Sequence, residues 1–342
     1  MRARFGKVVA LLFFLMVGFA AVCEPEGSAP LRLLETISRP GVQRKWDHFG
    51  VDLNGNRLFV ASENEPVVEV FDLRTNKLLH IISGFKRPHN ILIRDDLNEI
   101  FITDGEASEL KVFRSDSYNL IDQIGLSIDA DPIAYDPDSK LLYIVNGGRE
   151  AHTPYCLVSI VDTNSRKKLT DIKLDTDRLE SMAIEKSGPR LFVNMAGTSE
   201  VGVIDRNQRK LIQTWPITAG AANVPMQLDE RDHRLFVVTR KPARLVVLNT
   251  ETGKEVANLP IGIGTDDLAY DPIHHRIYAP SLEGFVAVIE QQNPDSYRLL
   301  AKIPTASGAK TAVLLPELNR YYVGVPSRDK QEARLLVFSV GE

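Results

Sequence analysis

Acidic and imidazole side chains occupy one repeated position in this chain of 342 residues. Asp47, His89 and Asp131 follow one another at intervals of 42 residues. Imidazole and carboxylate groups together are ligands for Zn²⁺, Mn²⁺ and similar ions. Carboxylates gathered in one small volume repel one another unless a cation or protons intervene. If the fold brings these residues together, they form a metal site or a pocket for a cationic or hydroxyl-rich ligand.

The repeat is marked by an aromatic residue inside a short apolar phrase, as in Asn56-Arg57-Leu58-Phe59-Val60. The spacings between successive aromatic residues are 42, 42, 49, 44, 42 and 44. The seven aromatic positions are Phe59, Phe101, Tyr143, Phe192, Phe236, Tyr278 and Tyr322. Seven copies at this period indicate a repeat architecture.

Each period contains four strand-like segments rich in β-branched and aromatic residues and separated by turn residues. In the first period they are residues 49–52, 58–61, 67–71 and 78–82. Helical periodicity is absent. Four strands in about 42 residues are typical of a propeller blade. The sequence therefore predicts an all-β, seven-bladed β-propeller of four-stranded blades.

Closure of the ring gives an independent indication of seven blades. After Tyr322 only one further clear strand, residues 335–340, precedes the end of the sequence. Residues 31–37 read as a spare outer strand. We expect this N-terminal strand to complete the last blade and leave no open edge. Residues 31–342 are then one propeller domain.

Counting back 11 or 12 positions from each aromatic residue finds the start of each blade's innermost strand, which faces the channel mouth. These positions are Asp47 and His48, His89 and Asn90, Asp131 and Pro132, Glu180 and Ser181, Val224 and Pro225 with Asn223 beside them, Asp266 and Asp267, and Lys310 and Thr311. We expect the polar members to bind a ligand at the channel mouth. Trp46 adjoins them and is expected either to form a wall of the pocket or to pack in the core.

Five of these side chains are candidate metal ligands: His48, His89, Asp131, Glu180 and Asp267. A divalent metal ion is the one candidate cofactor. The alternative is a hydrated polar funnel without a dedicated ligand, since channel mouths are wet.

Blade three carries a longer loop between its second and third strands. In blades one, four and five, the Asp or Asn that ends the third strand follows the aromatic residue by 13 residues. In blade three, Asp162 follows Tyr143 by 19 residues. The extra residues fall within 147–155, where Arg149, Glu150 and His152 could reach a ligand. A tolerated surface insertion is the alternative.

The N-terminus predicts export. Arg2, Arg4 and Lys7 precede an uncharged, largely apolar run over residues 8–22, which is typical of a secretory signal peptide. We expect residues 1–22 to be removed, 23–30 to be a short linker, and the protein to be periplasmic or secreted. No later segment is long and apolar enough to span a membrane.

The charge of the mature chain argues against nucleic-acid binding. The formal net charge of −4 becomes −7 without the three basic residues of the signal peptide. A nucleic-acid-binding protein is expected to be basic or to carry a basic stripe. Cys23 and Cys156 are the only cysteines, so at most one disulfide could form.

These phrases resemble the YncE-like, YVTN-repeat propellers, which are bacterial exported proteins with seven such blades. The resemblance covers about residues 31–342 and is closest in 46–52, 187–194 and 316–320. It implies the fold and export. It leaves the function open, since propellers of this shape include lactonases, lyases, electron-transfer enzymes and binding scaffolds.

The sequence favours a non-catalytic scaffold that binds a small ligand or protein partner at the channel mouth. G-x-S-x-G, paired C-x-x-C and H-E-x-x-H motifs are absent. The alternative is a metal-assisted hydrolase or lyase, for example a lactonase, in which ring carboxylates and His48 or His89 hold a divalent ion and one group acts as general base. We expect a monomer, because closed propellers have little need to oligomerise.

Overall fold

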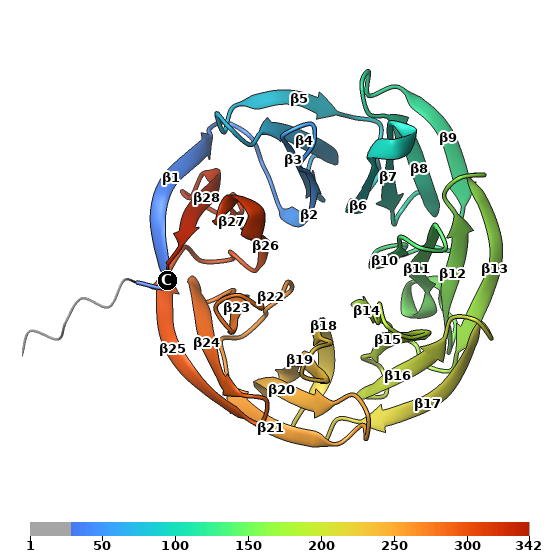
Figure 1. Cartoon of the computed structure of the whole chain (residues 1–342). Helices are drawn as coiled ribbons and strands as arrows, with labels where there is room; N and C mark the ends of the chain where they lie inside the picture. Colours follow the sequence, from blue (N-terminus) through green and yellow to red (C-terminus); the bar gives the residue numbers. More distant parts are fainter. Residues whose placement is uncertain (1–28, 342) are drawn as a thin grey trace, which may run out of the picture.

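The computed structural model describes residues 29–341, which form seven four-stranded antiparallel sheets arranged around a central axis (Figure 1). The predicted seven-bladed propeller is confirmed. The predicted signal peptide, Cys23 and most of the predicted linker lie outside the described residues. Within the described part of the chain, no helix is long and apolar enough to cross a membrane.

The first four blades follow one another along the chain. Blade 1 contains β2 (Trp46–Asp52), β3 (Arg57–Ser62), β4 (Val67–Asp72) and β5 (Leu78–Ile82). Blade 2 contains β6 (Pro88–Arg94), β7 (Glu99–Asp104), β8 (Glu109–Arg114) and β9 (Leu120–Gly125). Blade 3 contains β10 (Ile133–Asp136), β11 (Leu141–Gly147), β12 (Cys156–Asp162) and β13 (Lys167–Leu174). Blade 4 contains β14 (Met182–Ile184), β15 (Arg190–Met195), β16 (Glu200–Asp205) and β17 (Lys210–Pro216).

The remaining blades complete the circle. Blade 5 contains β18 (Ala221–Asp229), β19 (Arg234–Lys241), β20 (Ala243–Asn249) and β21 (Glu255–Pro260). Blade 6 contains β22 (Ala269–Asp271), β23 (Arg276–Ser281), β24 (Phe285–Asn293) and β25 (Ser296–Pro304). Blade 7 contains β26 (Thr311–Leu315), β27 (Arg320–Val325), β28 (Ala333–Val340) and β1 (Leu31–Arg39). Within residues 29–341, three short 3₁₀ helices lie in connections: η1 (Asp95–Leu97), η2 (Gly148–Ala151) and η3 (Pro316–Leu318).

The repeated aromatic residues form the core between blades. All seven are at most 1% exposed. Phe59 of blade 1, for example, packs with Ile91, Ile100 and Ile102 of blade 2. The second and third strands of each blade are covered on both faces, which explains why they read as continuous apolar runs rather than alternating ones.

In six of the seven blades, the turn between the first and second strands explains the residue type that precedes the aromatic phrase. Asn56, Asn98, Lys140, His233, His275 and Asn319 all adopt a left-handed backbone with φ between 52° and 60°. Asn tolerates this conformation better than most residues. The turn histidines therefore serve the backbone path on the face opposite the predicted mouth.

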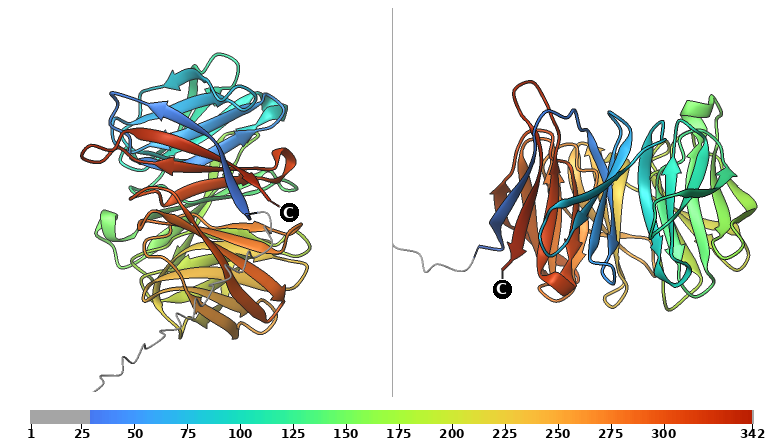
Figure 2. Two further views of the ribbon diagram at one scale, coloured as in Figure 1. Left: turned by 90° about the vertical axis from the view of Figure 1, so that its left-hand side faces the viewer. Right: turned by 90° about the horizontal axis from the view of Figure 1, so that it is seen from above.

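Strand β1 closes the ring as predicted. It pairs antiparallel with β28, with Leu31 opposite Val340 and Arg39 opposite Ala333. Figure 2 shows β1, in blue, lying along the red C-terminal strands. Leu31 is 2% exposed and packs in the cluster between blades 6 and 7. The pairing covers the edge that β28 would otherwise present to solvent.

Candidate functional site

The innermost strands deliver their first residues, or the residues just before them, to one end of the central channel. Two cavities meet there. The larger, of about 650 Å³, is here called the channel cavity and includes His48, Asn90 and Asp267 in its lining. The smaller, of about 350 Å³, is here called the vestibule and includes Asp47, His89 and Lys310. Asp131, Glu180 and Asp266 line both and define the waist between them.

His48 is held by carboxylates from two other blades. Its Nδ1 lies 2.8 Å from Asp267 Oδ1, and its Nε2 lies 3.7 Å from Asp131 Oδ1. Burial alone would lower the pKa of His48, but the charges of Asp267 and Asp47 outweigh burial and raise that pKa well above its usual value. The second oxygen of Asp267 accepts the backbone N–H of Ala312 at 2.9 Å, which fixes the carboxylate.

His89 forms a second pair with Asp47. Its Nδ1 lies 2.6 Å from Asp47 Oδ2, and both side chains are buried. Burial opposes the charge on the imidazole, but Asp131 and Asp47 raise the pKa of His89 to about 9. Burial likewise opposes the charge of Asp47, and His48 with His89 lowers its pKa below the usual value. The pair is therefore an imidazolium–carboxylate pair at neutral pH.

The waist carboxylates differ in how well they are compensated. Asp266 contacts the side chains of both Lys310 and Arg240. Glu180 forms an ion pair with Arg178 at 2.5 Å from Oε1, and Arg240 contributes further positive charge. Asp131 accepts a hydrogen bond from Asn90 Nδ2 at 3.1 Å, and its histidine neighbours lie 3.7 and 3.8 Å away.

The pKa values of Glu180 and Asp131 are both raised. Burial raises the pKa of Glu180 to about 7, with only partial relief from Arg178. Burial, together with the charge of Asp47, also raises the pKa of Asp131 above its ordinary value despite His89 and His48. Burial therefore outweighs the neighbouring cationic groups at both carboxyl groups.

A divalent ion would fit best among Asp47, His48 and Asp131. One ligand atom from each lies within 4.8 Å of the other two. Bond lengths of about 2.0–2.2 Å to carboxylate oxygen and imidazole nitrogen are compatible with such separations. The Asp267–His48 contact also matches the usual support of a ligating imidazole by a carboxylate.

The other predicted metal ligands are placed differently. His89 has Nδ1 on Asp47, and its buried Nε2 has no hydrogen-bond partner among the described residues. Gly105 adjoins that Nε2, since a Cβ there would lie 2.9 Å from it. Asp267 holds the far nitrogen of His48, and Glu180 contacts Arg178. The structure thus gathers Asp47, which was outside the predicted metal set, with two members of that set.

Trp46 and Asn223 were expected at the ligand site but line neither cavity. Trp46 is 2% exposed, packs between blades 7 and 1, and donates its indole N–H to Val325 O at 2.8 Å. Asn223 is buried and donates to Asn194 Oδ1 at 2.6 Å and Glu200 O at 2.9 Å. Trp46 therefore takes the core-packing role, one of the two expected for it, and Asn223 takes an internal hydrogen-bonding role.

The long loop of blade 3 lies at the vestibule, where it forms η2. Arg149 and Glu150 line the vestibule, and Arg149 contacts Asp177 at 3.0 Å. His152 ends η2 with a left-handed backbone and is exposed away from the cavity lining. Of the three loop residues that were expected to reach a ligand, His152 is the one that lines neither cavity.

Sequence reasoning missed several cavity residues. Arg178 and Arg240 contact the waist carboxylates, yet neither lies at the counted position. Met182, Met226 and Leu268 form the deeper wall of the channel cavity. These three could have been found, because each lies two residues beyond a counted position and alternate strand residues share a face.

Comparison with known proteins finds solved structures of similar fold. No protein-family model matches the sequence, and a search of curated proteins found no match. Kuenenia stuttgartiensis hydrazine synthase contains a similar structure, with a TM-score of 0.72, 17% identity, and coverage of 83% of this chain and 95% of that chain. The structure of U3-55K gives a TM-score of 0.73 at 11% identity, covering 91% and 99%. A chain of the mitotic checkpoint complex gives 0.72 at 12% identity, covering 100% and 99%.

The fold therefore defines a seven-bladed β-propeller. At these identities the likeness shows the fold alone.

Proposed function

We propose that the protein is an exported binding scaffold that recognises a small ligand or a protein partner at the channel mouth. The observation that carries this proposal is the meeting of two cavities, of about 650 and 350 Å³, at a waist of charged side chains. A concave site with a few convergent polar groups is the usual form of a ligand site. The larger cavity lies in the size range of small-molecule pockets.

Export rests on the sequence. The basic start and apolar run of residues 1–22 support a periplasmic or secreted location. The resemblance to YncE-like propellers supports the same location. Fractionation of cells that produce the full chain, with N-terminal sequencing of the product, tests this: an intact N-terminus in the cytoplasm would contradict it.

The channel site is tested by narrowing the channel cavity. Ser181 lines that cavity beside Glu180, so Ser181→Trp places a large side chain in the passage. Ser165→Trp, in the exposed turn between β12 and β13, is the matched control. Compounds from a small-molecule library that raise the melting temperature of the wild type should bind the control equally and Ser181→Trp weakly. Equal binding to all three proteins would place the ligand elsewhere.

A metal-assisted hydrolase or lyase is the second candidate function. The convergence of Asp47, His48 and Asp131 favours it. A bound divalent ion would supply Lewis acidity and a water of lowered pKa. Glu180 would then be placed to hold a proton at the waist. Against it, the pKa of His48 is raised, so a metal must displace the imidazole proton before it binds.

Elemental analysis of the purified protein separates the two functions. Stoichiometric metal that is lost in His48→Ala and retained in His152→Ala would support the metal enzyme and direct assays to lactone and lyase substrates. Absence of metal in the purified protein, with no change in melting temperature on addition of Zn²⁺, Mn²⁺ or Ca²⁺, would contradict it.

A further inference from the structure

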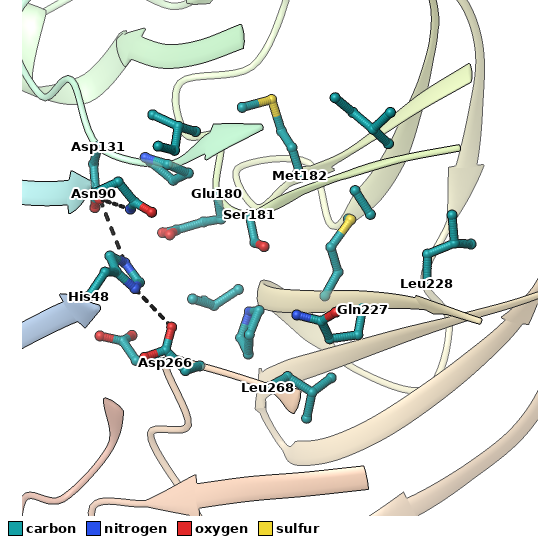
Figure 3. Close-up of a pocket in the computed structure, with 18 of the residues that line it drawn as sticks. His48, Asn90, Asp131, Glu180, Ser181, Met182, Gln227, Leu228, Asp266 and Leu268 are labelled. Atoms are coloured by element: carbon teal, nitrogen blue, oxygen red, sulfur yellow. Dashed lines mark hydrogen bonds and ion pairs between the residues drawn. The ribbon is translucent and has the colours of Figure 1, made fainter. Parts of the chain in front are cut away.

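Three uncharged polar side chains of the channel cavity have hydrogen-bonding capacity that no described residue uses. Asn90 lies in β6 of blade 2, Ser181 precedes β14 of blade 4, and Gln227 lies in β18 of blade 5. Within residues 29–341, no hydrogen bond involves the Ser181 hydroxyl or the Gln227 side-chain amide, and none reaches Asn90 Oδ1. Figure 3 shows Asn90 and Gln227 on opposite sides of the pocket.

These free groups include both donors and acceptors. The Ser181 hydroxyl donates and accepts, the Gln227 amide offers two N–H donors and a carbonyl, and Asn90 Oδ1 accepts. A ligand that displaces water from such groups without replacing its hydrogen bonds leaves them unpaired, which is unfavourable. A ligand hydroxyl can both donate and accept, so it can replace water at any of the three. The cavity therefore suits a ligand with several hydroxyl groups better than an apolar one.

The charged groups around the cavity are already matched with one another, which favours a neutral ligand. Each of the four carboxylates nearest the waist has at least one cationic neighbour from the protein itself. These are Asp267 with His48, Asp266 with Lys310 and Arg240, Glu180 with Arg178, and Asp131 with His48 and His89. A cationic ligand would compete with these neighbours, and an anionic ligand would be repelled by the carboxylates.

Apolar side chains lie directly beside the free polar groups. Met182 follows Ser181 in the chain, Met226 precedes Gln227, and both methionines line the channel cavity with Leu268. Leu268 and Gln227 also line a smaller cavity of about 290 Å³, whose wall includes the aromatic ring of Phe49. The wall thus offers apolar contact and hydrogen bonds in the same place. A cyclic polyol has both complementary parts, since its hydroxyl groups surround a ring with C–H faces.

We infer that the channel cavity binds a neutral cyclic polyol, such as a pyranose sugar, with its hydroxyl groups on Asn90, Ser181 and Gln227 and a C–H face against Met182 and Met226. This inference rests on the proposed function, because it takes the channel as the ligand site. The three polar groups come from different blades and face the cavity from more than one side. A ring with hydroxyl groups around its edge matches this arrangement better than a ligand with a single polar end. The flexible methionine side chains adapt to its C–H face.

Saturation-transfer NMR with methyl glucoside, methyl galactoside, methyl mannoside and cellobiose tests the inference. At least one of these sugars should bind the wild type with a dissociation constant in the millimolar range or below. Among the monodeoxy derivatives of that sugar, at least one should bind about tenfold more weakly, because a polar group of the protein is then left without a partner. The amino-sugar and uronic-acid forms of the same sugar should bind more weakly than the neutral form.

The variant Ser181→Ala/Gln227→Leu removes two of the free polar groups without adding charge. It should bind the sugar at least about tenfold more weakly than the wild type. Ser165→Ala/Gln213→Leu is the matched control, because both of its side chains are exposed and line neither the channel cavity nor the vestibule. The control should bind the sugar with wild-type affinity. Both variants should keep the wild-type melting temperature, which separates a loss of binding from a loss of folding.

Three results would each overturn the inference. They are tighter binding of the amino-sugar or uronic-acid form, unchanged affinity in Ser181→Ala/Gln227→Leu, and the absence of binding by every sugar at millimolar concentration. The library test with Ser181→Trp decides the proposed function independently. A library ligand that binds in the channel while the sugars fail would leave that function standing and remove only the polyol.

Discussion

His48 Nδ1 lies 2.8 Å from Asp267 Oδ1, although 219 residues separate the two in sequence. The contact joins blade 1 to the segment just before β22 of blade 6 across the channel mouth. Because a propeller converges its innermost strands on one axis, residues far apart in the chain form one electrostatic unit. Asp267 is itself fixed by the backbone N–H of Ala312, so the orientation of the imidazole is determined by blades 6 and 7.

Asp267→Asn should lower the pKa of His48 toward the ordinary value of 6.5, because Asp267 is the leading carboxylate that raises it. The amide oxygen can still accept the Ala312 N–H, so the backbone is expected to hold. NMR titration of the His48 ring protons measures the change. An unchanged midpoint would show that Asp47 and Asp131 hold the proton without Asp267.

The His89–Asp47 pair should make stability depend on pH above neutrality. The pKa of His89 is raised from 6.5 to about 9, so its contribution is fully present below about pH 6.5 and is lost as pH rises through about 9. The stability advantage of the wild type over His89→Gln should shrink by about 3 kcal/mol across this range. Urea unfolding at about pH 6.5 and about pH 9.5 measures it. His152→Gln, an exposed control, should show no such change, and a constant gap for His89→Gln would contradict the pair.

Glu180→Gln should stabilise the protein at high pH, because it removes a carboxyl group that is costly to ionise in its buried position. The pKa of Glu180 is raised from 4.5 to about 7, so ionising this buried carboxyl costs stability as pH rises through that window. The variant should match the wild type near pH 4.5 and exceed its unfolding free energy by up to about 3 kcal/mol above pH 7. Such a gain is typical of a site that serves binding at the expense of stability. Denaturant unfolding at both pH values measures the difference in unfolding free energy. A variant less stable than the wild type at high pH would show that the Arg178 contact outweighs the burial of the charge.

Gly105→Ala should destabilise blade 2, because the added Cβ would lie 2.9 Å from His89 Nε2. Overpacking of this kind costs about 1–3 kcal/mol. Gly125→Ala in the same blade is the matched control, since nothing lies within 4 Å of a Cβ there. Thermal unfolding of the two variants should differ clearly. Equal melting temperatures would mean that His89 is free to move away.

Closure of the ring predicts a contrast between two leucines of β1. Leu31 is 2% exposed and Leu33 is 52% exposed. Leu31→Ala should cost about 2–5 kcal/mol, as for other buried leucines, whereas Leu33→Ala should change stability by less than about 0.5 kcal/mol. Unfolding in guanidinium measures both. Similar small effects would show that β1 does not carry the closure.

The sequence was sufficient to predict the seven blades and their closure, because each blade repeats one pattern of buried aromatic residue and turn. It also placed Asp47, His48, His89, Asp131, Glu180, Asp266, Asp267 and Lys310 at the channel, since equivalent positions of a repeat occupy equivalent places. It could not distinguish which neighbour at each position turns inward. Trp46 and Asn223 are buried away from the cavities, and both lie 13 residues before the aromatic residue of their blade, one position ahead of the counted pair. Contacts of Arg178 and Arg240 across blades depend on side-chain conformations that no repeat pattern encodes.

The most direct test of the channel as the ligand site is calorimetric titration of library ligands into the wild type, Ser181→Trp and Ser165→Trp. We predict that ligands which bind the wild type bind Ser165→Trp with the same affinity and lose at least about tenfold in affinity for Ser181→Trp. Equal affinities for all three proteins would contradict a site in the channel.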